Sequence, residues 1–235
     1  AEMTANVKQK ATLRGITQDV RLVIRPAGLR EDDLFMKTSV RRGEITFQLR
    51  VANPQKLTGD AGARFVVRPY EREAAVKQFP ARLQLTGEEV QEFSFTCPWR
   101  DAHLWETDDP YLYQAEAVLD RDGGTVEHSL PRRFGFREVW TEGRNLMLNG
   151  HKARFRVEWS SFGLNENSVS YFKLLGRNMI YFQSNPSGWW RDWGGEVFNF
   201  PQETLDLCDR EGIAVLLPVP TVNFGRERLL NDPVM

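Results

Sequence analysis

The chain has 235 residues, of which 41% are apolar and 27% are charged, and its net charge is −1. These values are ordinary for a globular protein, and they exclude the large basic surface with which nucleic-acid-binding proteins hold phosphates. The longest apolar run, IAVLLPVP at 213–220, is far shorter than the roughly 18 residues that a transmembrane helix needs. We therefore expect neither a nucleic acid nor a membrane among the partners.

Residues 34–136 have the pattern of an all-β domain. In EITFQLRVAN, at 44–53, every second residue is apolar: Ile45, Phe47, Leu49 and Val51. This period of two indicates a strand with one buried face. The run ARFVVRPY at 63–70 repeats the pattern, and Asp-Gly-Gly at 122–124 is typical of a hairpin turn. The spacing predicts about seven short antiparallel strands in an immunoglobulin-like sandwich over 31–140.

The pattern changes after residue 145. Strand-like and helix-like runs now alternate, at 153–159, 165–178, 178–183, 201–212 and 213–220. The order β-α-β-α-β predicts a parallel sheet covered by helices. Such a segment can open either a doubly wound sheet or a (β/α)₈ barrel. No glycine-rich phosphate loop follows the first strand, which weighs against a nucleotide-binding sheet.

Both predicted helices carry end signals. In the first, Val169, Phe172 and Leu175 recur on one face and Gly176 stands where the helix should end. In the second, we expect Leu205 and Cys208 to share a buried face, with Gly212 following the last turn.

The cysteines and histidines have no spacing that indicates a metal or redox site. Cys97 lies in a strand-like run and Cys208 in a helix-like one, so we expect two buried free thiols rather than a bridge. The three histidines lie far apart, at 103, 128 and 151, without metal-ligand spacing. We expect neither a metal nor a cofactor.

Four phrases in sequence order resemble glycoside hydrolase family 2, which includes β-galactosidases, β-glucuronidases and β-mannosidases. They are GITQDVRLVIRP at 15–26, LWETDDPYLYQAEAVL at 104–119, RRFGFREVWTEGRNLMLNGHKARFR at 132–156 and LDLCDREGIAVLLP at 205–218. In the family the third phrase joins an immunoglobulin-like domain to the catalytic barrel. The resemblance spans nearly the whole chain.

The resemblance implies a domain organisation. Residues 1–30 would hold the last strand of an N-terminal sugar-binding jelly roll and a linker, 31–140 the immunoglobulin-like sandwich, and 141–235 the first three βα units of an incomplete TIM barrel. The chain would be a fragment of a longer enzyme, and its partners would be the remainder of that enzyme and a β-glycoside. The open edge of an incomplete barrel also allows a homo-oligomer. The sequence does not distinguish a periplasmic or extracellular location of the protein from a cytoplasmic one.

The implied chemistry is retaining hydrolysis of a β-glycoside by two carboxylates, an acid/base and a nucleophile. In the family both are glutamates near the ends of the fourth and seventh barrel strands. The resemblance ends after the third strand, so no catalytic residue is assigned in this chain, and the chain alone is expected to be inactive.

The expected pocket departs from the family pattern. The family often reads R-G-V-N-R-H after the first barrel strand, where this chain has RVEWSS at 156–161. After the second strand, Tyr181, Ser184 and Asn185 replace the usual Arg, His and Tyr. These differences keep a second hypothesis open, a non-catalytic carbohydrate-binding or structural relative.

Six residues are the candidate sugar contacts: Glu158, Trp159, Asn185, Trp189, Trp193 and Glu196. Flat indole faces suit the C–H faces of a sugar ring, and nearby charges can hold its hydroxyls. The alternatives stay open: the tryptophans of the run at 187–200 could pack their loop onto the barrel rim, and Glu158 could be the surface partner of an arginine.

Three further charged groups have structural interpretations. Arg154 and Arg156 are expected within the first strand of the α/β segment, where burial would require anionic partners. The phrase RRFGFRE at 132–138 is expected to clamp a domain interface rather than to bind a ligand. Asp206 and Asp209 are expected to be solvated helix residues.

Overall fold

The computed structural model describes residues 27–72, 75–160, 164–182 and 202–216. The phrase at 15–26, expected to be the last strand of a preceding domain, lies outside the described residues. The described chain forms two compact units: residues 27–155 together with Asp209–Ile213, and the remaining described residues. No helix within these described ranges is both long and apolar enough to cross a membrane.

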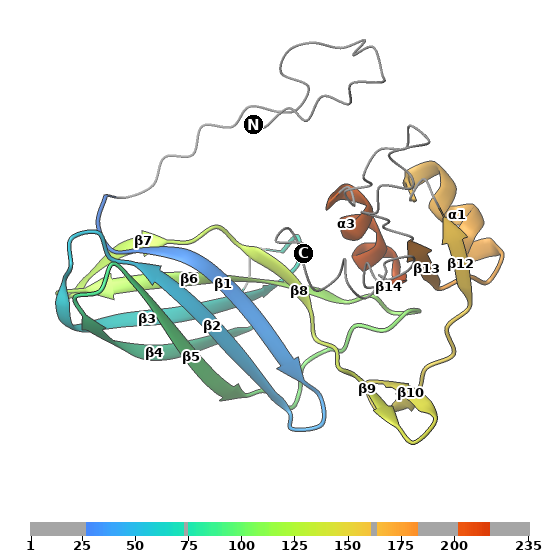
Figure 1. Cartoon of the computed structure of the whole chain (residues 1–235), viewed down its shortest axis with the longest axis horizontal. Helices are drawn as coiled ribbons and strands as arrows, with labels where there is room; N and C mark the ends of the chain where they lie inside the picture. Colours follow the sequence, from blue (N-terminus) through green and yellow to red (C-terminus); the bar gives the residue numbers. More distant parts are fainter. Residues whose placement is uncertain (1–26, 73–74, 161–163, 183–201, 217–235) are drawn as a thin grey trace, which may run out of the picture. The chain divides into compact units, whose positions relative to one another are not determined.

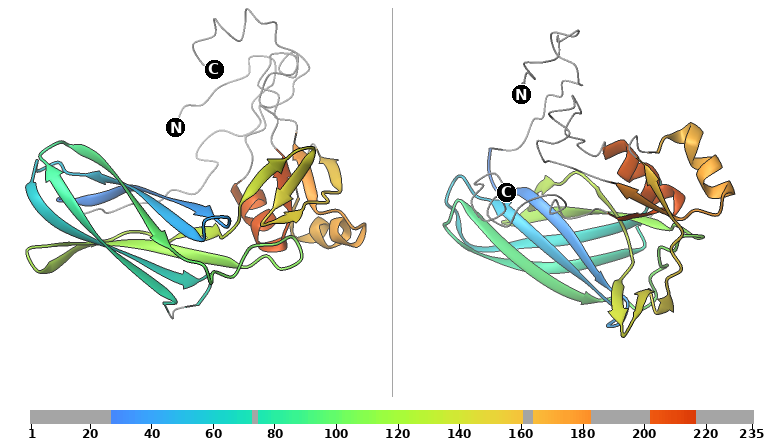
Figure 2. Two further views of the ribbon diagram at one scale, coloured as in Figure 1. Left: turned by 90° about the horizontal axis from the view of Figure 1, so that it is seen from below. Right: turned by 45° about the vertical axis from the view of Figure 1, so that its right-hand side comes forward.

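The first unit contains two facing antiparallel sheets (Figures 1 and 2). The smaller has the order β1-β2-β5, and its strands are Arg30–Ser39, Glu44–Ala52 and Val90–Pro98. The larger has the order β4-β3-β6-β7, with strands Lys77–Thr86, Thr58–Pro69, Leu112–Arg121 and Gly124–His128; β8, Arg132–Gly135, also pairs with β6. The described residues between 34 and 136 contain no helix. The all-β expectation is confirmed, and the architecture is consistent with an immunoglobulin-like domain.

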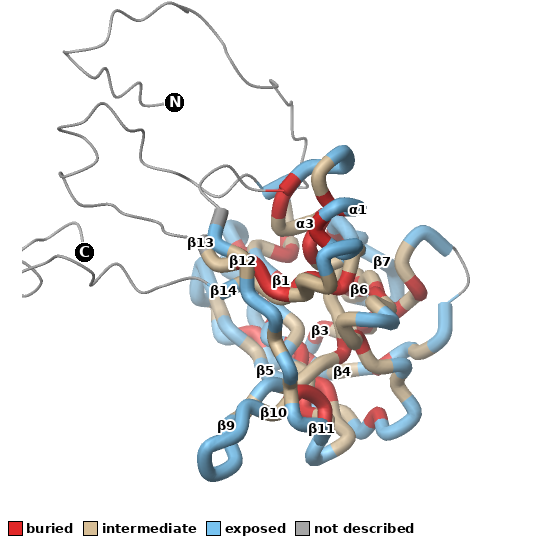
Figure 3. Tube along the Cα trace, turned by 90° about the vertical axis from the view of Figure 1, so that its right-hand side faces the viewer, coloured by how far each residue is buried: buried red, intermediate tan, exposed pale blue. Residues whose placement is uncertain are grey.

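The core between these sheets is made of the inward-facing residues that the period of two identifies. Ile45, Phe47, Leu49 and Val51 of β2 are at most 1% exposed. The Phe47 ring stacks on that of Phe65, with 4.2 Å between the ring centroids. In Figure 3 the buried colour recurs along these strands and is interrupted by partly exposed residues. The core is therefore closed by side chains of the unit itself.

The hairpin predicted at 122–124 joins β6 to β7. Asp122 and Gly123 occupy the two loop positions and have φ of 52° and 81°. Left-handed conformation at both positions is what a tight hairpin with the right-handed strand twist requires, and Asp-Gly adopts it at low cost.

A small antiparallel sheet follows the sandwich within the same unit. Its strands are β9 (Val139–Glu142), β10 (Asn145–Leu148) and β11 (His151–Lys152), in the order β11-β10-β9. In Figure 3 much of β9 carries the exposed colour.

The second unit has the predicted β-α-β-α-β order. Its elements are β12 (Val157–Ser160), α1 (Glu166–Leu174), β13 (Met179–Phe182), α3 (Gln202–Glu211, the end of which belongs to the first unit) and β14 (Ala214–Leu216). The strands form a parallel sheet in the order β12-β13-β14. Residues 217–220 of the expected third strand lie outside the described residues.

Helix α1 ends at the predicted glycine. Gly176 has φ of 70°, its N–H donates to the carbonyl of Lys173, and the N–H of Arg177 donates to that of Phe172. This is a Schellman motif, which closes the last turn with a left-handed residue. Leu175 is the C-cap and is 51% exposed. The expectation that it continues the buried face of Val169 and Phe172 was therefore wrong, because the helix has already ended.

Two further expectations need correction. The first strand of the second unit begins at Val157 rather than at residue 153, so Arg154 and Arg156 precede it and are exposed. The strand begins where its parallel pairing with Met179 begins. In α3 the buried residues are Thr204, Leu207 and Cys208; Leu205 is partly exposed.

Candidate functional site

The carboxyl ends of β12, β13 and β14 bring three large side chains to one face of the parallel sheet. Trp159 is in register with Tyr181, and Tyr181 with Leu216. Residues in register lie on the same face of a sheet, and neighbours along a strand lie on opposite faces. Trp159 is 53% exposed and Leu216 45%. The predicted sugar contact Trp159 thus presents an accessible indole.

Glu158 lies on the opposite face from Trp159. Its register neighbours are Ile180, which is completely buried, and through it Val215. The Oε2 atom of Glu158 lies 3.0 Å from Nε of Arg177, which follows α1. Both side chains are well exposed, so the ion pair contributes little to stability. Glu158 therefore has the arginine partner that the alternative interpretation, a surface ion pair, predicted. It lies on the other face of the sheet from Trp159.

The other predicted sugar contacts, Asn185, Trp189, Trp193 and Glu196, lie outside the described residues. Within the described ranges no group of three or more His, Cys, Asp or Glu side chains could hold a metal ion. Cys97 and Cys208 are free thiols, of which Cys208 is buried and Cys97 partly so. Burial raises the pKa of the Cys97 thiol, which disfavours the reactive thiolate.

Sequence reasoning missed a buried asparagine in the small sheet. Asn149 is 6% exposed and has φ of 52°. Its Nδ2 donates to the carbonyl of Trp105 and to Oε1 of Glu106, both at 2.9 Å, and its Oδ1 accepts from the N–H of Glu138 at 2.8 Å. The Asn-Gly pair at 149–150 was the available signal, since asparagine tolerates the left-handed region. Asn149 ties the small sheet to the sandwich loops.

Glu138 makes a second connection between the same parts. Its carboxylate accepts hydrogen bonds from Ser39 Oγ at 3.1 Å and from the backbone N–H and Nε of Arg41 at 2.9 and 2.7 Å. Burial alone would raise the pKa of the Glu138 carboxyl, but the hydrogen bonds from Arg41 and Ser39 outweigh burial and hold the pKa below its ordinary value of 4.5. Charge-assisted bonds of this kind favour the ionised form.

The phrase at 132–138 supplies two arginines that contact Asp209, a residue of the same compact unit. Both terminal nitrogens of Arg137 lie 3.3 Å from Oδ1 of Asp209, and Arg133 Nη2 lies 3.5 Å from Oδ2. The Arg137 guanidinium also stacks over the ring of Trp105 at 4.3 Å. Asp209 is therefore an ion-pair partner and not the solvated residue that its helical position predicted.

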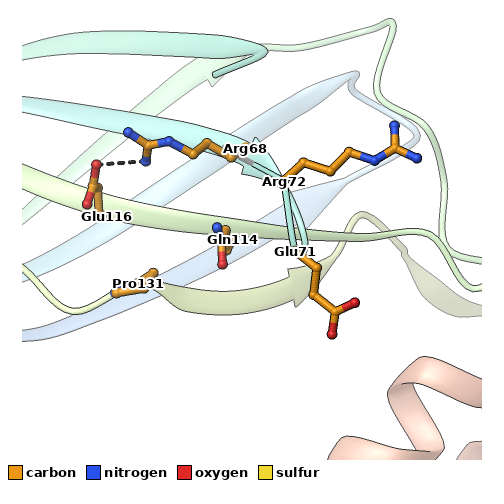
Figure 4. Close-up of a pocket in the computed structure, with 6 residues that line it drawn as sticks. All are labelled: Arg68, Glu71, Arg72, Gln114, Glu116 and Pro131. Atoms are coloured by element: carbon orange, nitrogen blue, oxygen red, sulfur yellow. Dashed lines mark hydrogen bonds and ion pairs between the residues drawn. The ribbon is translucent and has the colours of Figure 1, made fainter. Parts of the chain in front are cut away.

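Another feature that the sequence did not reveal is an open groove on the outer face of the larger sheet. It has a volume of about 410 Å³ and is lined by Arg68, Glu71, Arg72, Gln114, Glu116 and Pro131 (Figure 4). Arg68 on β3 is joined to Glu116 on β6 by a hydrogen bond of 2.7 Å. The lining comes from three separate stretches of the sequence, 68–72, 114–116 and 131, so no local pattern marks these residues as a set.

Comparison with known sequences finds glycoside hydrolase family 2 again, and the match begins and ends close to the ends of the sandwich. The sequence model described as "Glycosyl hydrolases family 2" matches residues 30–137. A beta-glucuronidase of Paenibacillus borealis is 29% identical over 177 residues, which cover 72% of this chain and 29% of the relative. A beta-glucuronidase of Streptococcus agalactiae serotype V is 24% identical over 217 residues, covering 89% of this chain and 32% of the relative. The chain thus spans about a third of the length of these relatives.

Comparison with solved structures shows the same fold. A glycosyl hydrolase family 2 member from Bacteroides cellulosilyticus DSM 14838 aligns with a TM-score of 0.64 and 21% identity, covering 80% of this chain and 26% of that one. A GH2 beta-galacturonidase from Eisenbergiella tayi, solved with galacturonate, aligns with a TM-score of 0.57 and 24% identity, covering 80% of this chain and 33% of that one. The family phrases, the model match and these relatives agree, and residues 30–137 of the chain match family 2 of the glycosyl hydrolases.

Proposed function

We propose that the chain is part of a retaining β-glycosidase that hydrolyses O-glycosyl bonds, with its catalytic glutamates outside this chain. The observation that carries the proposal is the family match over residues 30–137, followed along the chain by a parallel β-α-β-α-β segment. The relatives named as beta-glucuronidases support this class of reaction.

In the proposed organisation, residues 1–30 end a sugar-binding jelly roll, 31–140 form the sandwich, and 141–235 begin a (β/α)₈ barrel. The parallel sheet β12-β13-β14 supports this, because parallel strands joined by helices are the building unit of such a barrel. The rest of the enzyme would supply the remaining strands. It is therefore the first partner that we propose, and a second copy of the chain is the alternative.

Retaining hydrolysis needs two carboxyl groups about 5–5.5 Å apart, one as acid/base and one as nucleophile. Among the described residues of β12, β13 and β14, Glu158 is the one carboxylate, and it pairs with Arg177. The described strands therefore offer no catalytic pair, which supports placing both glutamates elsewhere in the enzyme.

For the substrate we propose a β-glycoside held in part by Trp159, at the carboxyl end of β12. Its exposed indole can cover the C–H face of a sugar ring. Asn185, Trp189, Trp193 and Glu196 remain proposed contacts from the sequence. Glu158 remains a weaker one, since Arg177 already holds its carboxylate.

The second candidate function is a non-catalytic carbohydrate-binding or structural relative. The replacement of the usual pocket residues by Tyr181, Ser184 and Asn185 favours it. The two candidates differ in whether the complete polypeptide carries a glutamate at the end of its fourth barrel strand and another at the end of its seventh.

The test is turnover of a panel of nitrophenyl β-glycosides, by this chain and by the longest natural polypeptide that contains it. We expect no turnover by the chain alone. The longer polypeptide should release the sugar with retained anomeric configuration, followed by proton NMR. Activity of the chain alone that survives repurification would contradict the placement of the glutamates. Inactivity of the longer polypeptide on every substrate would favour the non-catalytic candidate.

A further inference from the structure

We propose that the groove on the outer face of the larger sheet binds a neutral oligosaccharide. This site lies on the sandwich and does not depend on the glycosidase proposal. Its volume of about 410 Å³ is in the range of small-ligand sites, about 300–1,000 Å³. The groove is shallow and open to solvent, so a chain longer than the groove can lie across it.

The groove is lined by planar polar groups that suit sugar hydroxyls. The Arg68–Glu116 pair is partly buried, with side-chain exposures of 26% and 16%, so the guanidinium and carboxylate are held in place side by side. Gln114 is in register with Arg68 on the neighbouring strand. A guanidinium, a carboxylate and a carboxamide together offer donors and acceptors in fixed planes, which is what paired hydroxyls require.

The end of the groove is a tight turn between Pro69 and Arg72. The N–H of Arg72 donates to the carbonyl of Pro69 at 3.2 Å, and Glu71 has φ of 60°. A glutamate in the left-handed region is uncommon and is held there at a cost in free energy. Figure 4 shows the side chains of Glu71 and Arg72 projecting from the turn in different directions, so the turn places one acceptor and one donor group at the groove.

An adjoining groove of about 290 Å³ shares Glu71 and Arg72 and adds Tyr70 and Tyr111. The Tyr111 ring stacks on His103 with 4.1 Å between centroids, and the Tyr70 ring lies under the Arg133 guanidinium at 5.4 Å. Each ring is thus held in one orientation before a ligand arrives, which lowers the entropic cost of binding. Aromatic faces beside hydroxyl-binding groups are the composition that a sugar ring fits.

The charge of the groove selects a neutral ligand. Two arginines are matched by two glutamates in its lining. An acidic chain would be repelled by Glu71 and Glu116, and a basic chain would be repelled by Arg68 and Arg72. The adjoining groove adds Arg210, which has an interaction of its own within the structure.

The experiment is isothermal titration of the full chain with hexasaccharides of β-1,4-linked glucose, mannose, xylose and galactose, and with hexagalacturonate as the acidic probe. We expect at least one neutral hexasaccharide to bind with a Kd below about 1 mM, and hexagalacturonate to bind more weakly. Arg72→Ala and Gln114→Ala should each weaken binding at least about fivefold. The matched controls are Arg82→Ala and Gln84→Ala, exposed residues of β4 outside the groove lining.

Thermal melting would confirm that each variant is folded. The proposal is overturned if no neutral hexasaccharide binds with a Kd below about 1 mM, if only hexagalacturonate binds, or if the groove variants bind as tightly as their controls. Because the deciding readout is the loss of binding in the groove variants relative to their controls, sugar binding at Trp159 cannot mimic it. The result is also independent of whether a longer polypeptide hydrolyses glycosides.

Discussion

The sandwich and the α/β segment differ in how completely their own residues bury their apolar side chains. In the sandwich, Phe47, Phe65 and Val67 are completely buried between the sheets. In the α/β segment, Val157, Trp159 and Leu216 are 43–53% exposed on the strands. Helix α1 and its C-cap also expose large apolar groups: Tyr171 at 63% and Leu174 at 80% in the helix, and Leu175 at 51% at the cap.

The difference follows from the two kinds of sheet. Antiparallel strands joined by hairpins can fold into two facing sheets that cover one another. A parallel sheet needs a layer on both faces, and the described residues of the α/β segment leave Val157, Trp159 and Leu216 exposed on its strands. The sandwich therefore closes a core with its own residues, whereas the described part of the α/β segment does not cover all of its apolar side chains. Each prediction below tests one side of this contrast.

The largest expected effect is in hydrogen exchange of the isolated chain. We expect amides in the sandwich strands of 34–136 to exchange at least about a thousandfold more slowly than those of 166–182 and 202–216, because amides in a closed core open only with global unfolding. Mass spectrometry with peptide resolution would measure it. Equal protection of the two regions, in a chain shown to be monomeric by sedimentation, would mean that the α/β segment needs no further cover.

The next effect is the loss of one aromatic ring. Phe47→Ala should lower the free energy of unfolding by about 3–5 kcal/mol. The substitution removes the ring that stacks on Phe65 and leaves a cavity in a closed core. Phe35→Ala is the control on the same sheet, because Phe35 is 56% exposed, and it should cost less than about 0.5 kcal/mol. We expect a similarly small cost for Trp159→Ala in the α/β segment. Urea denaturation would compare the three variants. A cost at Trp159 equal to that at Phe47 would show that the α/β segment holds a closed core after all.

A smaller effect is expected at the connection between the sandwich and the small sheet. Asn149→Ala should cost about 2–4 kcal/mol, because it removes one buried and two partly buried hydrogen bonds and places alanine at a left-handed position. Asn149→Gly keeps the backbone conformation and should cost about 1 kcal/mol less. Asn145→Ala, at an exposed position in β10, is the control. Equal losses of stability in the alanine and glycine variants would show that the left-handed backbone conformation at position 149 does not contribute to the cost.

The smallest effect is a pH dependence at Glu138. Its pKa in the folded chain lies below the ordinary 4.5, so its contribution to stability is fully present above about 4.5 and is lost as the pH falls through the lower folded value. Glu138→Gln should therefore flatten the fall in stability as the pH is lowered below about 4.5. Glu142→Gln, an exposed glutamate on β9, should leave the profile unchanged. An identical profile for the two variants would rule out Glu138 as the titrating group.

The amino-acid sequence by itself determined most of the elements and the resemblance to family 2. The period of two in EITFQLRVAN placed β2 and its buried face, Asp-Gly-Gly placed a hairpin, and Gly176 marked the end of α1. Such signals are readable because each depends on the conformation of a few consecutive residues. The family phrases add the resemblance to family 2, which the model match over residues 30–137 supports.

Only the tertiary structure decided which side chains meet. Glu158 and Trp159 are neighbours in sequence, yet the register of β12 with β13 puts them on opposite faces and leaves Glu158 with Arg177. Asp209 looks solvated in its helix and instead accepts from Arg137, 72 residues away. Contacts of this kind depend on the registers and packing of elements that are distant in the chain, and no local pattern encodes them.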